Sequence, residues 1–194
     1  MADERQNAVS GHVFIAVSVD GFIARTDGSI DWLERASTDP LPGATSEDYG
    51  YAGFLAEMDC IVMGRGTFEK TLTFGAWPFT KPVIVLSSTL SDQNLRPDLH
   101  GKVRISNLSP GELFNELSTF GWRRAYIDGG KIIQAFLREG LIADFVITRI
   151  PVLIGEGLPL FGSLPADIVL RHNETESFAS GFVQSKYGVD PTRP

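Results

Sequence analysis

The sequence predicts a single three-layer α/β/α domain built on a mainly parallel mixed β-sheet with antiparallel strands at its C-terminal edge. Short β-branched runs alternate with amphipathic helical stretches along most of the chain, as in strands joined by crossover helices. The final segment instead alternates polar and apolar residues, which is typical of an antiparallel hairpin. At 194 residues the chain is long enough for one domain with a full core.

The composition is that of a globular protein and argues against several functional classes. Hydrophobic residues make up 43% of the chain and charged residues 21%, and no apolar run is long enough to cross a membrane. A net charge of −7 without a basic stripe argues against a nucleic-acid partner. The histidines are scattered and Cys60 is the single cysteine, so neither a metal site nor an internal disulfide is expected.

The polar ends of the chain set the expected limits of the domain. We expect a disordered N-terminal tail over residues 1–11, a folded domain over residues 12–188 and a short tail over residues 189–194. Residues 1–10 lack the apolar stretch of a secretory signal, so a cytoplasmic location is expected.

The first strand is predicted over residues 12–19, where apolar and β-branched side chains dominate. Asp20 and Gly21 end it. The loop over residues 22–32 carries apolar anchors among glycine and aspartate. Such a loop covers a binding site in some proteins and plugs the edge of a core in others.

A helix is predicted from Glu47 to about Met58, with Ser46 as its N-cap. Asp48 would lie in the first turn, next to the apolar face of the helix. There its carboxylate would either complement the helix dipole or serve a site. The apolar face comprises Tyr51, Phe54, Leu55 and Met58.

A strand, a tight turn and a helix start are predicted where the apolar run of residues 60–63 breaks at Gly64. The helix would continue to about Thr73, and the backbone amides of its first turn would lack partners. Arg65 adds a cation and Thr67 a hydroxyl beside these amides. This turn is either an anion-binding site or an ordinary strand-to-helix connection.

Two further strands are predicted over residues 83–86 and 103–106. The first ends in a cluster of hydroxyl side chains over residues 87–89. The second precedes a helix with a capping box, in which Ser109 is the N-cap and Glu112 the third helical residue.

A second strand, glycine turn and helix follow, with the strand over residues 125–127 and the turn at Asp128, Gly129 and Gly130. Adjacent glycines let a ligand approach the backbone closely, although packing between helix and strand alone can require them. The helix is expected to continue through Arg138.

The remaining part of the chain is predicted to be rich in strands. A long strand covers residues 142–150, and residues 167–187 form a hairpin with its turn near Gly181. A long exposed sheet edge near this hairpin favours a homodimer.

Five segments resemble, in order and spacing, the dihydrofolate reductase fold. They resemble above all the branch typified by the reductase domain of the bifunctional riboflavin-biosynthesis deaminase-reductase, RibD. The resemblance covers residues 12–187, and the zinc signature of the deaminase half is absent. The segments are residues 16–24, 63–67, 86–88, 128–130 and 151–157.

The resemblance implies that NADPH is the cofactor. In this fold the first glycine turn binds phosphates, the end of the next strand lies beside the 2′-phosphate, and the double-glycine turn takes the pyrophosphate and nicotinamide ribose. The cofactor-binding residues implied are Ala16, Ile23, Gly64, Arg65, Gly66, Thr67, Leu86, Ser87, Ser88, Asp128, Gly129, Gly130, Lys131 and Ile132.

The resemblance also implies that Asp48 faces the substrate and that Thr148 supports its carboxylate, which makes these two the expected catalytic residues. The expected substrate contacts are Phe14, Trp32, Asp48 and Ala52. Asp128 stands where dihydrofolate reductases have the first of three glycines, and Ala52 where they have an aromatic residue, so folate-type binding is not favoured.

The function implied is hydride transfer from NADPH to a small heterocyclic or carbonyl substrate. The resemblance is to 5-amino-6-(5-phosphoribosylamino)uracil reductase. The alternatives are a dihydrofolate reductase-type activity, and a non-catalytic nucleotide-binding protein that has kept the fold.

Overall fold

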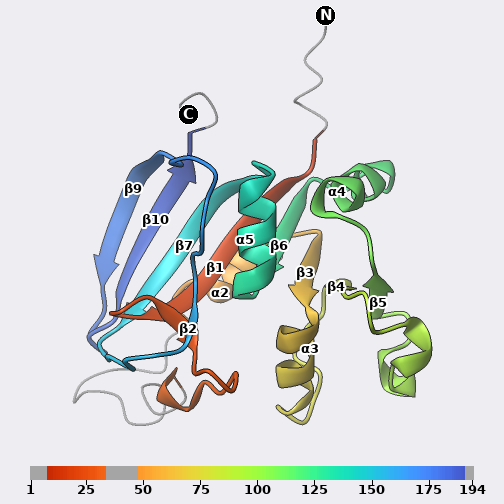
Figure 1. Cartoon of the computed structure of the whole chain (residues 1–194), viewed down its shortest axis with the longest axis horizontal. Coiled ribbons are helices and arrows are strands. Elements are labelled where there is room, and N and C mark those ends of the chain that lie inside the picture. The colour runs from red at the N-terminus through yellow and green to blue at the C-terminus, as the bar shows by residue number, and fades with distance from the viewer. Residues whose placement is uncertain (1–7, 34–47, 191–194) are drawn as a thin grey trace, which may run out of the picture.

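The computed structural model describes residues 8–33 and 48–190, which form an eight-stranded sheet with helices on both faces (Figure 1). The strands of this sheet are β1 Ser10–Ser18, β3 Cys60–Gly64, β4 Val83–Leu86, β5 Val103–Ser106, β6 Arg124–Asp128, β7 Ile142–Ile150, β9 Leu170–Ser177 and β10 Val183–Val189. Their order is β5-β4-β3-β6-β1-β7-β10-β9. The neighbouring pairs from β5 to β7 are parallel, and β10 pairs antiparallel with β7 and β9. The predicted fold class is confirmed.

The helices divide the apolar core into one layer on each face of the sheet. On one face, α4 Pro110–Thr119 and α5 Gly130–Arg138 pack on a cluster that includes Val13, Ile127 and Phe136. On the other face, α2 Tyr51–Ala56 and α3 Arg65–Leu72 pack on a cluster that includes Ile61 and Met63. Two short 3₁₀ turns, η2 Asp92–Asn94 and η3 Pro97–Leu99, lie between β4 and β5. Figure 1 shows α5 in front of the centre of the sheet and α2 behind it.

The N-terminus of α4 has the predicted capping box. The Ser109 hydroxyl accepts a hydrogen bond from the Glu112 amide at 3.4 Å, and the Glu112 carboxylate accepts one from the Ser109 amide at 2.9 Å. Pro110 occupies the first helical position, where its missing N–H leaves no acceptor unpaired. This local sequence signal therefore places the start of the helix correctly.

The start of α2 differs from the prediction, because the helix begins at Tyr51 rather than at Glu47. Tyr49 and Gly50 have positive φ angles of 53° and 83°, so the chain turns sharply before the helix. Asp48 therefore precedes the helix. The proposed cap Ser46 and Glu47 lie outside the described residues.

The limits of the domain agree closely with the strand ends. β1 begins at Ser10, two residues before the predicted start, and β10 ends at Val189. The tails were predicted over residues 1–11 and 189–194. Residues 1–7 and 191–194 of them lie outside the described residues, while Ser10 and Gly11 belong to β1 and Val189 to β10. The domain limits themselves stay a prediction.

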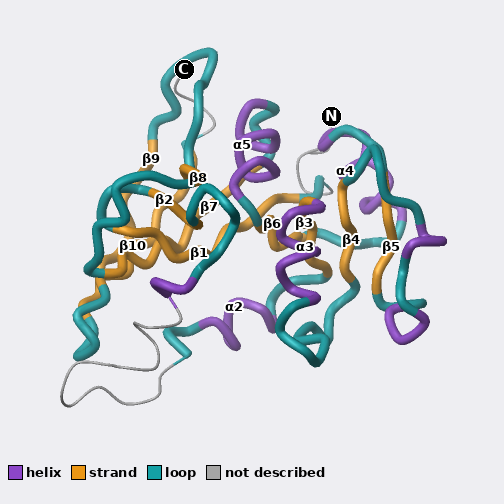
Figure 2. The backbone as a smooth tube through the Cα atoms, turned by 60° about the horizontal axis from the view of Figure 1, so that its bottom comes forward, coloured by secondary structure: helices purple, strands orange, loops and turns teal. Residues whose placement is uncertain are grey.

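The parallel strands end at the lower edge of the sheet in Figure 1, which is turned toward the viewer in Figure 2. We call this the carboxyl edge. A separate two-stranded sheet, β2 Phe22–Ala24 with β8 Leu158–Pro159, pairs the loop after β1 with the loop after β7. The sequence did not predict this pairing, because two- and three-residue strands carry no periodic pattern.

Candidate functional site

The carboxyl edge brings the predicted cofactor residues together. β3 lies between β4 and β6 in the sheet. At its carboxyl end, Gly64 pairs with Leu86 of β4, and Met63 pairs with Asp128 of β6. Residues 64–67, 86–88 and 128–132 therefore follow the ends of adjacent parallel strands. Open α/β sheets bind ligands beyond the carboxyl ends of their strands, where the strand order reverses. Here β6 returns between β1 and β3, which places such a reversal at these turns.

The two glycine turns pack against each other. A Cβ atom at Gly129 would overlap the Thr67 hydroxyl, and one at Gly64 would lie 3.0 Å from the Ile132 side chain. Gly129 also has a φ of 91°, which favours glycine. The packing explanation of these glycines is therefore correct for the contact between the turns. The close approach of a cofactor to them stays a prediction.

Gly130 is enclosed by the loops of the small sheet. A Cβ atom there would lie 2.9 Å from the Pro159 carbonyl oxygen and 3.0 Å from Ile23 Cδ1. The structure thus brings Ile23, one of the cofactor-binding residues that the resemblance implies, next to the double-glycine turn. Lys131, the next residue of α5, is exposed to solvent.

Asp20 joins the loop after β1 to the loop after β7. Its carboxylate accepts hydrogen bonds from the amides of Ile154, at 3.2 Å, and Gly155, at 2.8 Å. Hydrogen bonding, first from Ser18 and then from these amides, lowers the pKa of Asp20. The loop after β1 is therefore attached to the loop after β7, beside the start of α5.

The N-terminus of α3 combines free amides with a cation and hydroxyl groups. Gly64 is the N-cap and supplies no side-chain acceptor, so the first-turn amides face outward. The exposed Arg65 donates through Nε to Glu69 at 2.7 Å and through Nη1 to the Thr89 hydroxyl at 3.1 Å. Arg65 thus spans from α3 to the turn after β4, as an anion site between these elements requires.

The turn after β4 is ordered by Ser87, whose hydroxyl accepts hydrogen bonds from the amides of Thr89 at 3.2 Å and Leu90 at 3.1 Å. Ser88 is exposed beside it. Both serines line an open polar hollow of about 530 Å³ that continues to Ser106 and Asn107 at the end of β5. Thr89 was not among the predicted site residues, although it follows the two serines directly.

Asp48 and Thr148 do not meet. The exposed Asp48 carboxylate accepts hydrogen bonds from the amides of Gly50, at 3.0 Å, and Ala52, at 2.9 Å, and these bonds lower its pKa. Thr148 is buried, and its hydroxyl accepts a hydrogen bond from Gln184 Nε2 at 3.0 Å. The expectation that Asp48 lies in the first helical turn facing Thr148 is therefore wrong, because α2 begins later and the Asp48 carboxylate caps it. A catalytic role for either residue stays a prediction.

The predicted substrate contacts lie in different environments. Phe14 is partly buried and its ring contacts Tyr51, with centroids 5.4 Å apart, whereas Ala52 is exposed on α2. Trp32 is 4% exposed and packs with Ile150 and others at the carboxyl ends of β1 and β7. Its indole Nε1 is buried without a hydrogen-bond partner in the described part of the chain.

A carboxylate that the sequence assigned to cofactor binding lies in an environment suited to proton transfer. Asp128 ends β6, and burial raises its pKa to about 6, against the smaller, lowering effects of the Gly129 amide and of Tyr126. Tyr126 is buried and donates to the Phe14 carbonyl at 3.0 Å. Tyr51 lies across from it, with ring centroids 6.2 Å apart.

Asp128, Tyr126 and Tyr51 influence one another electrostatically. Burial raises the pKa of Tyr51 to about 12, and the charge of Asp128 adds to this effect. The pKa of Tyr126 is also raised, first by burial and then by Asp128. Both phenols are therefore neutral hydrogen-bonding groups at physiological pH. From the sequence, Tyr51 was expected to have only an apolar role, because its side chain falls on the apolar stripe of the helix.

Metal and membrane features are absent from the described residues. Among residues 8–33 and 48–190, no group of three or more potential ligand side chains is placed to hold a metal ion. None of the helices in this part of the chain is long and apolar enough to span a membrane.

The sheet order, the paired glycine turns and the helix start with Arg65 define an α/β protein of the dihydrofolate reductase-like fold. The model of the RibD C-terminal domain family matches residues 11–184, and the chain belongs to this family. The uncharacterized protein YwjB of Bacillus subtilis is 32% identical over 184 residues, covering 90% of this chain and 95% of that protein.

Two solved structures are similar over nearly the whole chain. A putative riboflavin biosynthesis protein from Shewanella sp. PV-4 superposes with a TM-score of 0.85 at 36% identity, covering 94% of this chain and 99% of that one. A diaminohydroxyphosphoribosylaminopyrimidine deaminase/5-amino-6-(5-phosphoribosylamino)uracil reductase from Thermotoga maritima superposes with a TM-score of 0.72 at 14% identity. That match covers 96% of this chain and 58% of the larger protein, and it shows the shared fold.

Proposed function

We propose that this protein is an NADPH-dependent reductase that transfers a hydride to a small heterocyclic or carbonyl substrate, as 5-amino-6-(5-phosphoribosylamino)uracil reductases do. The observation that carries the proposal is the convergence, at one sheet edge, of an anion-binding helix start, two glycine turns and a partly buried carboxyl group. Membership of the RibD C-terminal domain family and the reductase name of the Thermotoga maritima relative support it.

The residues at the carboxyl edge fit a nicotinamide dinucleotide phosphate. Arg65, Ser88 and Thr89 offer a cation and hydroxyl donors for the 2′-phosphate, and the amides at the starts of α3 and α5 suit the pyrophosphate. The backbone at Gly129 is only partly buried, whereas Gly130 lies buried beneath the loops of the small sheet. Bound NADPH supplies the hydride to an electron-poor carbon of the substrate.

The proton that must accompany the hydride comes, in this proposal, from Asp128. When a carbonyl or imine carbon gains a hydride, the neighbouring oxygen or nitrogen gains negative charge and needs a proton. A carboxyl group whose pKa is about 6 is partly protonated near neutral pH and can donate at that atom. Tyr51 and Tyr126 remain neutral beside Asp128 and keep its environment dry. Water then restores the proton.

The substrate would lie near Phe14 and Trp32, two of the predicted contacts, since Trp32 packs against Ala16 on the same face of β1 as Phe14. The unpaired indole N–H of Trp32 is a buried donor that a substrate carbonyl could satisfy, and leaving it unpaired is unfavourable. The solvent-exposed Asp48 binds backbone amides of its own turn. We therefore do not extend the proposal to dihydrofolate.

The test is NADPH oxidation, followed at 340 nm, with a panel of pyrimidine and carbonyl acceptors. Asp128→Asn should bind NADPH as tightly as the unmodified protein while hydride transfer falls by roughly a hundredfold, the loss expected for a missing general acid. Asp98→Asn, at an exposed carboxylate of η3, is the matched control and should change neither quantity. Full turnover in Asp128→Asn would refute the assignment of the proton donor. A hundredfold loss in Asp48→Asn instead would move that role to Asp48.

A further inference from the structure

Tyr49 has a backbone conformation that non-glycine residues rarely adopt. Its φ of 53° is the only positive value at a non-glycine residue among residues 8–33 and 48–190. Such a conformation costs on the order of 1 kcal/mol or more, and it persists only where the surrounding structure fixes it. It occurs in the turn immediately before α2, whose first residue Tyr51 packs near Tyr126 of β6, with ring centroids 6.2 Å apart.

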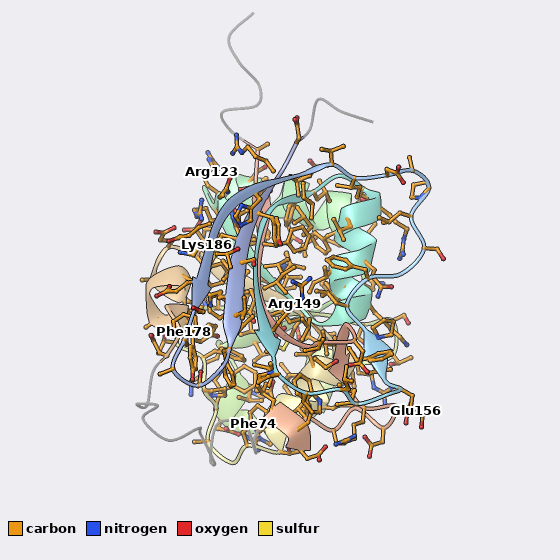
Figure 3. All side chains as sticks on the ribbon, turned by 90° about the vertical axis from the view of Figure 1, so that its left-hand side faces the viewer. Phe74, Arg123, Arg149, Glu156, Phe178 and Lys186 are labelled. Carbon is orange, nitrogen blue, oxygen red and sulfur yellow. The ribbon has the colours of Figure 1, made fainter. Side chains whose placement is uncertain are left out.

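The C-terminal hairpin of β9 and β10 holds this turn. Gln184 of β10 is 3% exposed, and its Nε2 donates to the Tyr49 carbonyl and to the Thr148 hydroxyl, each at 3.0 Å. The Tyr49 ring packs against two residues near the hairpin turn, Phe178 and Phe182, with ring centroids 4.9 and 5.0 Å away. Figure 3 shows Phe178 at this end of the hairpin. Both the backbone and the ring of Tyr49 are therefore fixed by the same hairpin.

We propose that Gln184 is a positioning residue for the reaction, which holds the turn over residues 48–50 so that Tyr51 packs on Tyr126, two residues before Asp128 in β6. This inference rests on the proposed function, in which Asp128 supplies the proton. The connection is short, because the Tyr51 amide donates to the Asp48 carbonyl at 3.0 Å, next to the residue that Gln184 holds. A shift of the turn therefore moves Tyr51.

Tyr51 in turn shapes the site around Asp128. Its ring packs on Phe14 and Tyr126, with centroids 5.4 and 6.2 Å away, and its phenol lies within the electrostatic influence of the Asp128 carboxyl group. Moving Tyr51 away would admit water to Asp128 and weaken the hold on Phe14. The residues proposed to bind the cofactor phosphates lie on α3, α5 and the β4 turn, so the same movement leaves the phosphate-binding part of the cofactor site in place.

Only a side chain with two donors on one nitrogen satisfies both acceptors that Gln184 reaches. The Tyr49 carbonyl and the Thr148 hydroxyl are on different segments, and the amide nitrogen has one N–H for each. A hydrophobic side chain of the same length would fill the space and leave the carbonyl without this bond. Losing one buried hydrogen bond costs about 1 kcal/mol, which is enough to release a strained turn partly.

The test compares Gln184→Met, which keeps the length of the side chain and removes its donors, with Ser185→Ala. Ser185 is the adjacent buried residue of β10 and binds Thr175 on β9 at 2.9 Å. Two readouts are needed. The first is hydrogen exchange of the Tyr51 and Ala52 amides, which requires no substrate. The second is the pair of kcat and KM for hydride transfer, measured with the Kd of NADPH and the melting temperature.

We expect amide exchange at Tyr51 and Ala52 to be about fivefold faster in Gln184→Met, as the loss of the buried hydrogen bond to the Tyr49 carbonyl predicts. We also expect kcat/KM for the substrate to fall about fivefold by the same reasoning, with the Kd of NADPH unchanged. Ser185→Ala should show neither effect. Unchanged exchange in Gln184→Met overturns the inference whether or not the protein is a reductase. Faster exchange with unchanged kcat/KM overturns the positioning role. If the unmodified protein reduces no acceptor, the proposed function fails and the exchange measurement still decides whether Gln184 holds the turn.

Discussion

Asp128 is the residue on which the chemistry depends most. It is partly buried at the end of β6, and burial raises its pKa to about 6 although the Gly129 amide and Tyr126 act to lower it. An ionised carboxylate is unfavourable at such a position. Carboxyl groups with strongly shifted pKa values are therefore candidates for functional sites. The sequence placed Asp128 in the glycine turn but gave no indication of its burial, which depends on side chains from β6 and α2.

The raised pKa of Asp128 makes stability depend on pH in a defined direction. Between the ordinary carboxyl pKa of 3.8 and about 6, the folded protein binds this proton and the unfolded chain releases it, so stability falls as pH rises. Asp128→Asn removes the penalty. Its free energy of unfolding should exceed that of the unmodified protein by on the order of 2 kcal/mol at pH 8, and by little at pH 4. Urea denaturation of both proteins at the two pH values measures this. An equal difference at pH 4 and pH 8 would contradict the assigned burial.

Residues whose roles depend on their neighbours in the sequence were predicted correctly. Residues whose partners lie far away in the chain were not. The turn at Gly64 and the capping box of Ser109 follow from short-range rules and are present. Gln184 and Tyr126 were missed, because their partners lie 135 and 112 residues away in the chain. No sequence pattern marks such contacts.

α2 and α3 show how far the spacing of apolar residues predicts the start of a helix. α3 begins at Arg65, as predicted, because a buried strand and a glycine fix the point where it starts. α2 is shorter than its apolar periodicity indicates, because the positive φ angles at Tyr49 and Gly50 interrupt the helix. The periodicity described the face of α2 correctly and its start incorrectly, and the position of Asp48 changed accordingly.

The contact of α3 with the turn after β4 predicts which nicotinamide cofactor is preferred. Arg65 already reaches Thr89 across this gap and would pair with a 2′-phosphate there. Arg65→Ala should weaken NADPH binding by roughly tenfold to a hundredfold, the range for hydrogen bonds to charged groups, and leave NADH binding nearly unchanged. Calorimetric titration with both cofactors measures this.

Arg96→Ala serves as the control for the Arg65 variant, because Arg96 forms an exposed ion pair with Asp98 in another segment. It should alter neither affinity. Equal affinities of the unmodified protein for NADPH and NADH would contradict the assignment of Arg65 and the β4 turn to the 2′-phosphate.

For the molecule as a whole, the sheet order decides what the separate motifs can do. Short crossover units predicted the α/β class, and the strand order β5-β4-β3-β6-β1-β7-β10-β9 places the glycine turns side by side. The position of β6 between β1 and β3 could not be predicted from the sequence alone, because this position depends on how α4 and α5 pack on the sheet. β9 is an exposed strand at the edge of the sheet. The homodimer expected from such an edge stays a prediction.

NADPH is proposed to bind across the carboxyl edge of this sheet, and an NADPH titration followed by amide NMR would show which residues it contacts. We predict saturable shifts of the Gly66, Ser88 and Gly130 amides, which lie at the starts of α3 and α5 and in the β4 turn. The Arg124 and Ile142 amides at the opposite edge should not shift. The absence of saturable shifts, or shifts confined to the opposite edge, would contradict the account.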